Sequence, residues 1–449
     1  MTERHSEATG TGRAPNRPNI VLVTADSIRA DHCGFLNDDI GTTPTLDALA
    51  RDGLVFENAI APGPRTPSSL PVLWTGEHVG HENKQVYTSR REKKERWQER
   101  RQRIRRHVSR FETVAERMSR RGYDTGAITA NPWTTRDTGF DQGFTHFVEV
   151  DSVPTDGALS PGKRLLSKAS ALPGVPDTGR WLLTWTDFYD HVLETRRKLL
   201  EPYFLWVFLL DSHQPYFAPS DYRTENTSVE MYYANAGYNY SHTAFEELPD
   251  RLRARFEAAY RDTIRSVDGF VEQLLADIGA DDPAVVFHAD HGEAMMEHGT
   301  RGHRPELYDE NLRVPLLAHN VGRSGCVTDQ VALRQLPGFL LSIAGRDPEP
   351  DRVRQDSLVA KTEEDERVTV RTADWKRIDS DDHFHFAHAS PMDELYHLES
   401  DPGERDNVFE NQPSVVENLD RRLARHDSAL DERRSISAAS RELARNNSL

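Results

Sequence analysis

The sequence predicts an α/β protein with a central mixed, mostly parallel sheet flanked by helices, followed by a small C-terminal α+β subdomain. Short apolar runs of strand length, such as 19–24 and 204–209, end in polar residues. Segments with helical spacing of apolar residues alternate with these runs, as 256–278 does before the strand at Val285. Such alternation is typical of a sheet covered on both faces. After Gly345 the chain becomes charged and is punctuated by proline, which indicates a separate small unit.

The elements expected in the large domain follow one another in the order that such a sheet needs. The helix over 43–50 carries a proline in its first turn, where the missing N–H leaves no hydrogen bond unmade. A Pro-Gly-Pro turn at 62–64 forces irregular backbone before an apolar helix over 69–76. A stretch rich in Pro, Gly and Ser over 153–176 indicates a long surface excursion. The remaining predicted elements are strands over 55–60 and 123–129 and a helix over 108–121.

The chain after Gly345 contains short strands and one helix. The runs over 367–370, 375–378 and 383–388 are expected to form strands in hairpins. Ser414 is a residue type that caps helices, and it begins a final helix expected over 414–426. We therefore divide the chain into a disordered N-terminal lead over 1–17, a large domain over 18–345, an α+β subdomain over 346–428 and a polar tail over 429–449.

Composition restricts the class of protein. The net charge of -17 argues against a nucleic-acid binder, which needs a basic face. Cys33 and Cys326 are far apart in the chain, so neither a disulfide framework nor a cysteine zinc site follows. No apolar run approaches the ~20 residues that span a membrane, and the polar N-terminus lacks the features of a secretory signal. We expect a soluble, cytoplasmic protein.

One segment runs against the acidic character of the chain. Residues 90–107 hold ten Lys or Arg against three Glu. A charge run of this kind is typical of a solvated helix. The alternative is a docking patch for an anionic partner or substrate.

Polar side chains that bind metals follow two of the predicted strands. Asp290 and His291 end the run VVFHADHGEAMMEH, and Asp26 follows the first strand. Ligands bind at the carboxyl ends of strands in open α/β sheets, and two carboxylates with an imidazole can hold a divalent cation. The alternatives are a polar turn around Asp290 and a helix N-cap at Asp26.

Five segments, taken together, resemble the sulfatase family of the alkaline phosphatase superfamily. They are NIVLVTADSIRADHCG, TTPTLDALARDGLVFENAIAPGPRTPSSLPVLWTG, DSHQPYFAP, VVFHADHGEAMMEHGTRGHRPELYDENLRVPLLAH, and the pair VRTADWKRI and ELYHLESDPGERDN. The resemblance implies that 18–345 is a catalytic domain of alkaline-phosphatase-like fold and that Asp26, Asp290 and His291 hold a divalent metal ion. Mn²⁺, Mg²⁺ and Ca²⁺ are the candidates. The imidazole favours Mn²⁺, because Ca²⁺ prefers an all-oxygen shell.

The same resemblance implies a threonine nucleophile. Counting nine residues back from the Thr-Gly at 75–76 gives Thr66. No formylglycine is expected there, because the β-carbon of threonine already bears a methyl group. Leu70 stands where the family carries an arginine, and the opening acid pair is reduced to Asp26-Ser27. These departures fit the branch of the superfamily whose threonine forms a covalent intermediate. The alternatives are that Thr66 only caps a helix, or that Ser68 or Ser69 is the nucleophile.

Four further residues are assigned to the pocket by the resemblance. His213 is expected to contact the transferred group or to protonate the leaving oxygen, with a structural histidine as the alternative. His303, Arg301 and Lys376 are expected to bind the substrate anion; the alternatives are that His303 binds a second metal and that Lys376 is an exposed lysine on a hairpin. Arg29 is expected to form a salt bridge with Asp31.

The resulting hypothesis is a metal-dependent hydrolase of sulfate or phosphate esters, either small molecules or glycans, that acts through a covalent Thr66 intermediate. Thr66→Ala and Asp290→Ala are predicted to abolish turnover. One alternative is a phosphotransferase or phosphodiesterase acting on lipid head groups or surface polysaccharide. Another is a non-catalytic interaction protein that binds an anionic ligand. The natural substrate and the oligomeric state stay open.

Overall fold

The structure is a computed structural model that describes most of the chain. The expected surface excursion over 153–176, the expected strand over 383–388 and residues 1–16 of the expected lead lie outside the described residues. The described residues are 17–79, 90–150, 183–240, 249–363, 366–380 and 393–446.

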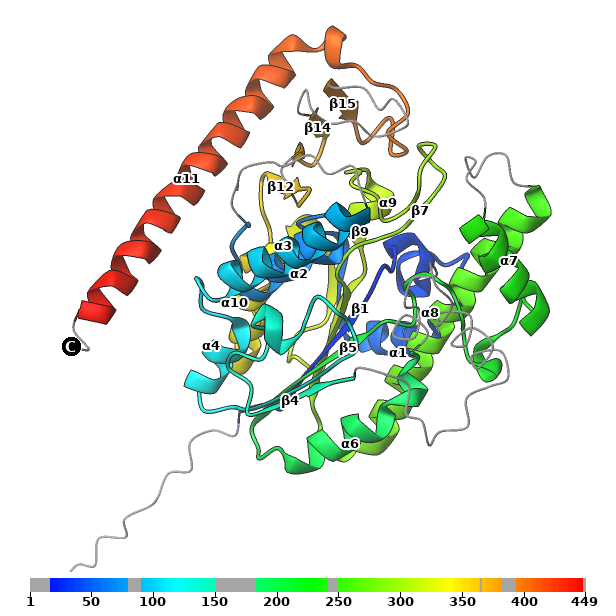
Figure 1. The fold of residues 1–449 in the computed structure, drawn as a ribbon, viewed down its shortest axis with the longest axis vertical. Coiled ribbons are helices and arrows are strands. Elements are labelled where there is room, and N and C mark those ends of the chain that lie inside the picture. Colours follow the sequence, from blue (N-terminus) through cyan, green and yellow to red (C-terminus); the bar gives the residue numbers. More distant parts are fainter. Residues whose placement is uncertain are drawn as a thin grey trace, which may run out of the picture.

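A mixed, mostly parallel sheet forms the centre of the large domain (Figure 1). β1 pairs in parallel with both β5 and β6, while β10 is antiparallel to β6 and β2. The predicted fold class is therefore confirmed. The strands of this sheet, in spatial order, are β11 (Gly325–Ala332), β2 (Leu54–Ile60), β10 (Leu316–His319), β6 (Ala284–Ala289), β1 (Ile20–Ala25), β5 (Tyr203–Leu209), β3 (Asp124–Thr129) and β4 (His146–Glu149). The short strand β9 (Arg313–Val314) pairs with β2.

Helices cover both faces of this sheet, which explains why its central strands are apolar throughout (Figure 1). Every residue of β1, β5 and β6 is buried. One layer holds α2 (Thr66–Thr75), α3 (Arg90–Val108), α4 (Val114–Arg120) and α10 (Leu336–Ala344). The other holds α1 (Pro44–Asp52), α6 (Tyr189–Lys198), α7 (Ser228–Tyr240) and α8 (Asp250–Ile278).

The small C-terminal unit is an antiparallel sheet with one long helix. The sheet contains β12 (Leu358–Lys361), β13 (Arg367–Arg371), β14 (Trp375–Ser380) and β15 (Asp393–His397), which confirms the two predicted strands that lie within the described residues. The helix α11 runs from Pro413 to Asn446, far beyond the expected 414–426, so most of the expected polar tail is helical. Ser414 lies inside its first turn and is not the N-cap. Leu419 of α11 is buried against Val370 and Leu395.

The basic segment forms α3, and the second half of this helix packs onto the large domain. Ile104 is buried in the core, and the ring of Trp97 lies 4.0 Å from that of Trp133. Arg100 forms an ion pair with Glu363 at 2.6 Å. The charge of Arg100 is therefore paired within the molecule, and the docking patch stays a prediction.

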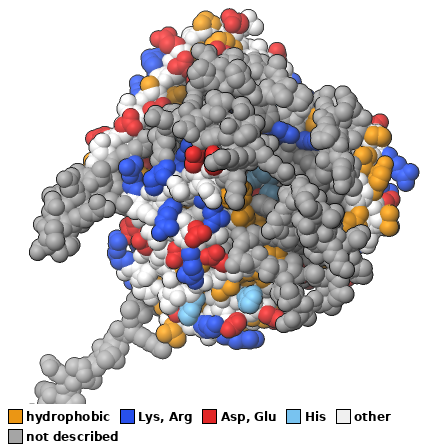
Figure 2. Space-filling model, in the orientation of Figure 1, with side chains coloured by type: hydrophobic (Ala, Val, Ile, Leu, Met, Phe, Trp, Pro, Cys, Tyr) orange, Lys and Arg blue, Asp and Glu red, His pale blue; other side chains and the backbone are white. Residues whose placement is uncertain are grey.

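Charged side chains of both signs are interspersed over the described part of the face in Figure 2. Among the helices of the described residues, none combines the length and the apolar character needed to cross a membrane.

Candidate active site

The carboxyl ends of the central strands bring together the residues that the sequence singled out. Ala25, the last residue of β1, is the register partner of Ala289, the last residue of β6. The next residue on each strand is an acid, so Asp26 and Asp290 emerge side by side at one edge of the sheet. The parallel pairing therefore joins two carboxylates that lie far apart in the chain.

Hydrogen bonds hold Asp26 in place from several sides. Its backbone N–H donates to the carbonyl of Leu209 at 3.0 Å, and its carbonyl accepts from the Ser212 hydroxyl at 2.5 Å. Its Oδ1 accepts from the Ser27 hydroxyl at 2.8 Å. Its Oδ2 accepts from the side-chain amide of Asn131 at 2.9 Å. Asp26 is therefore a fixed carboxylate and not a helix N-cap.

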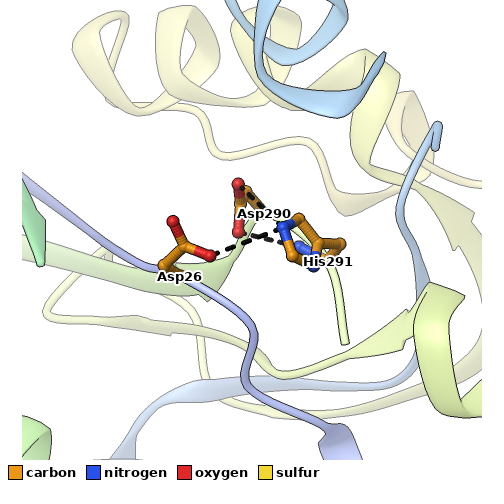
Figure 3. Close-up of side chains that lie close together, drawn as sticks. All are labelled: Asp26, Asp290 and His291. Atoms are coloured by element: carbon orange, nitrogen blue, oxygen red, sulfur yellow. Dashed lines mark hydrogen bonds and ion pairs between the residues drawn. The ribbon is translucent and has the colours of Figure 1, made fainter. Parts of the chain in front are cut away.

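His291 completes a group of three with the two acids (Figure 3). Its Nδ1 lies 2.8 Å from the carbonyl oxygen of Gly292, which can only accept, so Nδ1 carries the proton. The lone pair on Nε2 therefore faces Asp26 Oδ1 at 3.4 Å and Asp290 Oδ2 at 3.6 Å. One ligand atom from each of the three residues lies within 4.8 Å of the other two. We call these three residues the strand-end cluster.

The turn that carries Asp290 and His291 requires glycine at the next position. A Cβ on Gly292 would lie 2.1 Å from the carbonyl oxygen of Glu310, which is closer than any side chain can approach. The Gly292 N–H also donates to the Asn311 carbonyl at 2.8 Å. The glycine therefore lets the turn pack directly on the α9 segment (Asp309–Leu312).

The strand-end cluster carries buried negative charge that no lysine or arginine among the described residues balances by an ion pair. Asp26 and Asp290 are fully buried. No lysine or arginine of the described chain forms an ion pair with either carboxylate. Burial, together with the neighbouring Asp26 charge, raises the pKa of Asp290 well above its usual value. Burial also lowers the pKa of His291 to about 4, so the imidazole is neutral at pH 7.

A divalent cation fits this group. Two buried carboxylates repel each other, and a lone pair pointing at carboxylate oxygens is unfavourable unless a cation lies between them. Asp290 Oδ2 is buried and has no hydrogen-bond partner among the described residues. The donor set of two carboxylates and one neutral imidazole suits Mn²⁺, Mg²⁺ or a similar ion.

Thr66 lies next to the cluster at the start of α2. Its hydroxyl is 3.3 Å from His291 Nε2 and 3.5 Å from Asp26 Oδ2. It is the first residue of the helix, and the N-cap position belongs to Arg65. The cap alternative is therefore wrong for Thr66. The N-terminus of a helix carries partial positive charge that favours an anion at this point.

The two fallback nucleophiles are engaged elsewhere. The Ser68 hydroxyl donates to the Arg65 carbonyl at 2.9 Å. The Ser69 hydroxyl donates to the Asp290 carbonyl at 2.5 Å and so supports the turn that carries Asp290 and His291. Their arrangement favours Thr66 as the hydroxyl of the site.

His213 and His303 border the same cluster. His213 follows β5, and its ring centroid lies 4.9 Å from that of His303, which in turn lies 4.9 Å from that of His291. Burial beside His213 lowers the pKa of His303 to about 3. Three histidines from two distant segments therefore lie near Asp26, while the predicted roles of His213 and His303 toward the substrate stay predictions.

Arg301 and Lys376, the other two residues predicted to bind the substrate anion, differ in their exposure to solvent. Arg301 lies in β8 (Arg301–Gly302), two residues before His303, with a partly exposed side chain. Lys376 is fully buried in β14, and its ammonium group lies 2.9 Å from Asp309 and 2.6 Å from Glu404. Lys376 is thus committed to carboxylates of the protein itself, and its expected role in substrate binding has no support in its contacts.

Asn131 and Glu293 belong to the site but were missed by sequence reasoning. Asn131 follows β3 and touches Asp26. It lies two residues after the end of this buried strand, which is a weaker form of the signal that identified Asp26. Glu293 stands two residues after His291, is fully buried, and accepts a hydrogen bond from His303 Nδ1 at 2.8 Å. Burial raises the pKa of Glu293 to about 7. Nothing in the sequence around Glu293 indicates its contact with His303.

Known proteins similar to this chain share its fold. The family model described as Sulfatase matches residues 18–325. An ulvan-active sulfatase of Formosa agariphila is 24% identical over 333 residues, which cover 68% of this chain and 56% of that protein. The chain thus spans little more than half the length of that relative. The multifunctional alkaline phosphatase superfamily protein PehA of Trinickia caryophylli is 23% identical over 380 residues, which cover 69% of each chain.

Solved structures give the same picture at the level of the fold. A phosphonate monoester hydrolase of Agrobacterium radiobacter superposes with a TM-score of 0.61 at 18% identity, covering 93% of this chain and 96% of its own. A 2-O GAG sulfatase superposes with a TM-score of 0.61 at 18% identity, covering 94% and 93%.

Proposed function

This chain belongs to the sulfatase family, and from that premise we propose that it hydrolyses sulfate or phosphate esters with a divalent cation and Thr66 as the nucleophile. One observation carries the proposal. The Thr66 hydroxyl lies within 3.5 Å of both a carboxylate and an imidazole of the strand-end cluster, at the N-terminus of a helix. The non-catalytic alternative loses support from this geometry, since an anion-binding protein needs no hydroxyl beside buried acids.

The chemistry follows from the positions of these groups. A divalent cation held by Asp26, Asp290 and His291 would lower the pKa of the Thr66 hydroxyl and offset negative charge on the transferred group. Thr66 Oγ1 attacks sulfur or phosphorus, the bond to the ester oxygen breaks, and that oxygen leaves as an alcohol after taking a proton. Water then attacks the covalent intermediate, releases sulfate or phosphate and restores the hydroxyl. His213 and His303 stand where they can contact the transferred oxygens or the leaving oxygen.

The class of ester that the protein hydrolyses is also part of this proposal. Proteins similar to this chain include sulfatases active on glycans by name, a phosphonate monoester hydrolase and a multifunctional phosphatase-superfamily protein. Both sulfate and phosphate esters present a tetrahedral anionic centre that a cation and a helix N-terminus can bind. A sulfated or phosphorylated glycan or small molecule is therefore the substrate class that we propose.

The decisive experiment is a substrate panel with paired hydroxyl variants. Purified protein is assayed with Mn²⁺, Mg²⁺ or Ca²⁺ on nitrophenyl sulfate, phosphate, phosphonate and phosphodiester substrates. Thr66→Ala is expected to lower kcat by roughly 10⁴-fold or more, because the nucleophile is gone. The matched control Ser68→Ala removes a hydroxyl two residues away and is expected to stay within about tenfold of the wild type.

Acid quenching during turnover is expected to trap the transferred group on the peptide that contains Thr66. Release to an added alcohol in place of water would identify the phosphotransferase alternative. Normal turnover in Thr66→Ala would show that the nucleophile is wrong. Bound metal with no turnover on any substrate would favour the anion-binding alternative.

A further inference from the structure

The buried carboxylate of Glu293 lies at the junction of the two segments that carry His213 and His303. Its Oε2 accepts from His303 Nδ1 at 2.8 Å. Its Oε1 accepts from the Tyr216 hydroxyl at 2.9 Å and from the Gln214 side-chain amide. The carboxylate therefore has a different partner set on each oxygen, with two donors on one side and a single histidine on the other.

These contacts join parts of the chain that are distant in sequence. Gln214 and Tyr216 belong to the turn after β5, which also carries His213. Glu293 follows His291 on the turn after β6, and its N–H donates to the Glu310 carbonyl at 2.8 Å. One side chain thus fixes the turn of His213 relative to the segment that leads to His303.

The contact also sets the protonation pattern of the His303 ring. When Glu293 is ionised, its carboxylate only accepts, so the proton of the neutral His303 ring sits on Nδ1. The other ring nitrogen, Nε2, lies on the side of the ring away from Glu293. The rings of His213 and His291 both lie 4.9 Å from that of His303. A carboxylate that holds an imidazole in one tautomer and orientation is a known requirement of catalytic histidines.

We propose that Glu293 is a positioning residue that holds His303 with its proton on Nδ1 and Nε2 free to serve the reacting ester. This inference rests on the proposed function, because it takes the space beside Thr66 as the reaction centre. The other possibility is that Glu293 only anchors the two turns. The two differ in one respect: only a positioning residue makes catalysis depend on which nitrogen of His303 carries the proton.

The unequal partner sets of the two oxygens allow a near-isosteric test, Glu293→Gln. Two donors converge on the position of Oε1, so the amide oxygen of the glutamine must occupy it. Its NH₂ group then replaces Oε2 and faces His303 Nδ1. A donor at this point forces Nδ1 to accept, so the proton of His303 moves to Nε2. The variant therefore changes the tautomer while keeping the volume and the other hydrogen bonds.

Two measurements on the metal-loaded, full-length protein test the proposal. Nitrogen-15 NMR of the histidine rings, with the His303 signals assigned by His303→Gln, is expected to show Nδ1–H in the wild type and Nε2–H in Glu293→Gln. We expect kcat of Glu293→Gln to fall on the order of 10²- to 10⁴-fold. KM is expected to stay within a few fold, since the substrate anion is still bound. Tyr216→Phe is the matched control, because it removes one donor from the same carboxylate but leaves the His303 contact. It is expected to keep the Nδ1–H tautomer and to lose less than about tenfold in kcat.

The outcomes separate this inference from the proposed function. A Glu293→Gln protein with normal kcat, or with His303 still protonated on Nδ1, overturns the positioning role. Equal losses in Glu293→Gln and Tyr216→Phe without a tautomer change would mean that Glu293 is an anchor only. If Thr66→Ala retains turnover, the proposed nucleophile fails, while the tautomer measurement still decides the contact between Glu293 and His303.

Discussion

Two groups of acids in this molecule differ in whether cationic side chains compensate their charge. The strand-end cluster pairs Asp26 and Asp290 with a neutral imidazole, and no lysine or arginine of the described chain is paired with either acid. The second group, the subdomain cluster, consists of Asp309, Glu404, Lys376 and Arg371. In it Lys376 contacts both acids at 2.9 and 2.6 Å, and Arg371 contacts Asp309 at 3.2 Å. Two cationic side chains therefore match two carboxylates.

The difference separates a ligand site from a structural joint. A buried carboxylate without a counter-charge is costly, which supports the divalent cation that we propose for the strand-end cluster. The subdomain cluster needs none. Its members come from α9, β13, β14 and the turn after β15, so it fastens the small sheet to the large domain. Sequence resemblance assigned Lys376 to the pocket, but its ion pairs assign it to this joint.

The comparison is tested most strongly by removing one charge from the strand-end cluster. Asp290→Asn keeps the shape and the oxygen that accepts the N–H of His291. We expect turnover to fall by about 10³-fold or more, or about 4 kcal/mol of transition-state stabilisation. In chelator-treated protein, however, the thermal unfolding midpoint should stay at or above that of the wild type, because repulsion with Asp26 is relieved. A clear loss of stability in the metal-free variant would mean that the cluster is balanced after all.

Removing the lysine of the subdomain cluster should do the reverse. Lys376→Met leaves Asp309 and Glu404 buried with Arg371 alone, and breaking a buried pair typically costs about 3–5 kcal/mol. Urea unfolding should show this loss, while kcat per folded molecule changes little. The control is Lys198→Met, which breaks the exposed pair with Glu194 and should leave the urea midpoint nearly unchanged. A folded Lys376→Met protein that has lost its turnover would restore the role in substrate binding.

Metal addition sharpens the comparison further, because only one cluster should respond. An ion present at 100 times its Kd stabilises the folded state by about 2.7 kcal/mol. We expect this gain, as a higher unfolding midpoint with Mn²⁺, in the wild type and in Lys376→Met. It should be absent in Asp290→Asn. Equal gains in all three proteins would place the ion elsewhere.

The sequence predicted the strand-end cluster because Asp26 and Asp290 each directly follow a buried strand, and His291 is the next residue after Asp290. Asp26 and Asp290 end runs in which every residue is apolar or buried, and Thr66 was found by counting back from Thr75. Asn131 lies two residues after the buried strand β3, so a search that allows one intervening residue would have found it. Glu293 could not be found in this way, since its role depends on Tyr216 and His303, whose nearness to it arises only when the turns fold together.

The elements of the fold also divide into those that the local sequence pattern predicts and those that it does not. Apolar runs identified β1, β5 and β6, whereas β11 alternates irregularly between exposed and buried residues and gave no signal. The end of α11 was missed for another reason. Its residues after 429 are mostly polar, which indicates a tail, yet Ala, Arg, Glu and Leu are good helix formers. Hydrophobic periodicity cannot detect a helix whose sequence is mostly polar.

The smallest expected effect concerns pH and the histidine at the edge of the subdomain cluster. His298 lies against two acceptors, with Nδ1 2.7 Å from a Glu310 oxygen and Nε2 2.9 Å from the Glu404 carbonyl oxygen. Both nitrogens can donate at once only in the charged ring. Burial alone would lower the pKa of His298, but the Glu310 carboxylate raises it above the usual 6.5.

Because this pKa is raised on folding, the stability that His298 contributes is fully present below pH 6.5 and is lost as pH rises through the raised pKa. The difference in urea midpoint between the wild type and His298→Gln should therefore be largest at pH 6 and should shrink towards pH 9. It should be smaller than the difference that Lys376→Met produces. Burial raises the pKa of Glu404 to about 7, so this acid also titrates in the same range. Since Glu404 is present in both proteins, the difference between them reports on His298. A difference that stays constant across the range would mean that His298 acts by packing on Tyr308, whose ring lies 3.6 Å away, and not by its charge.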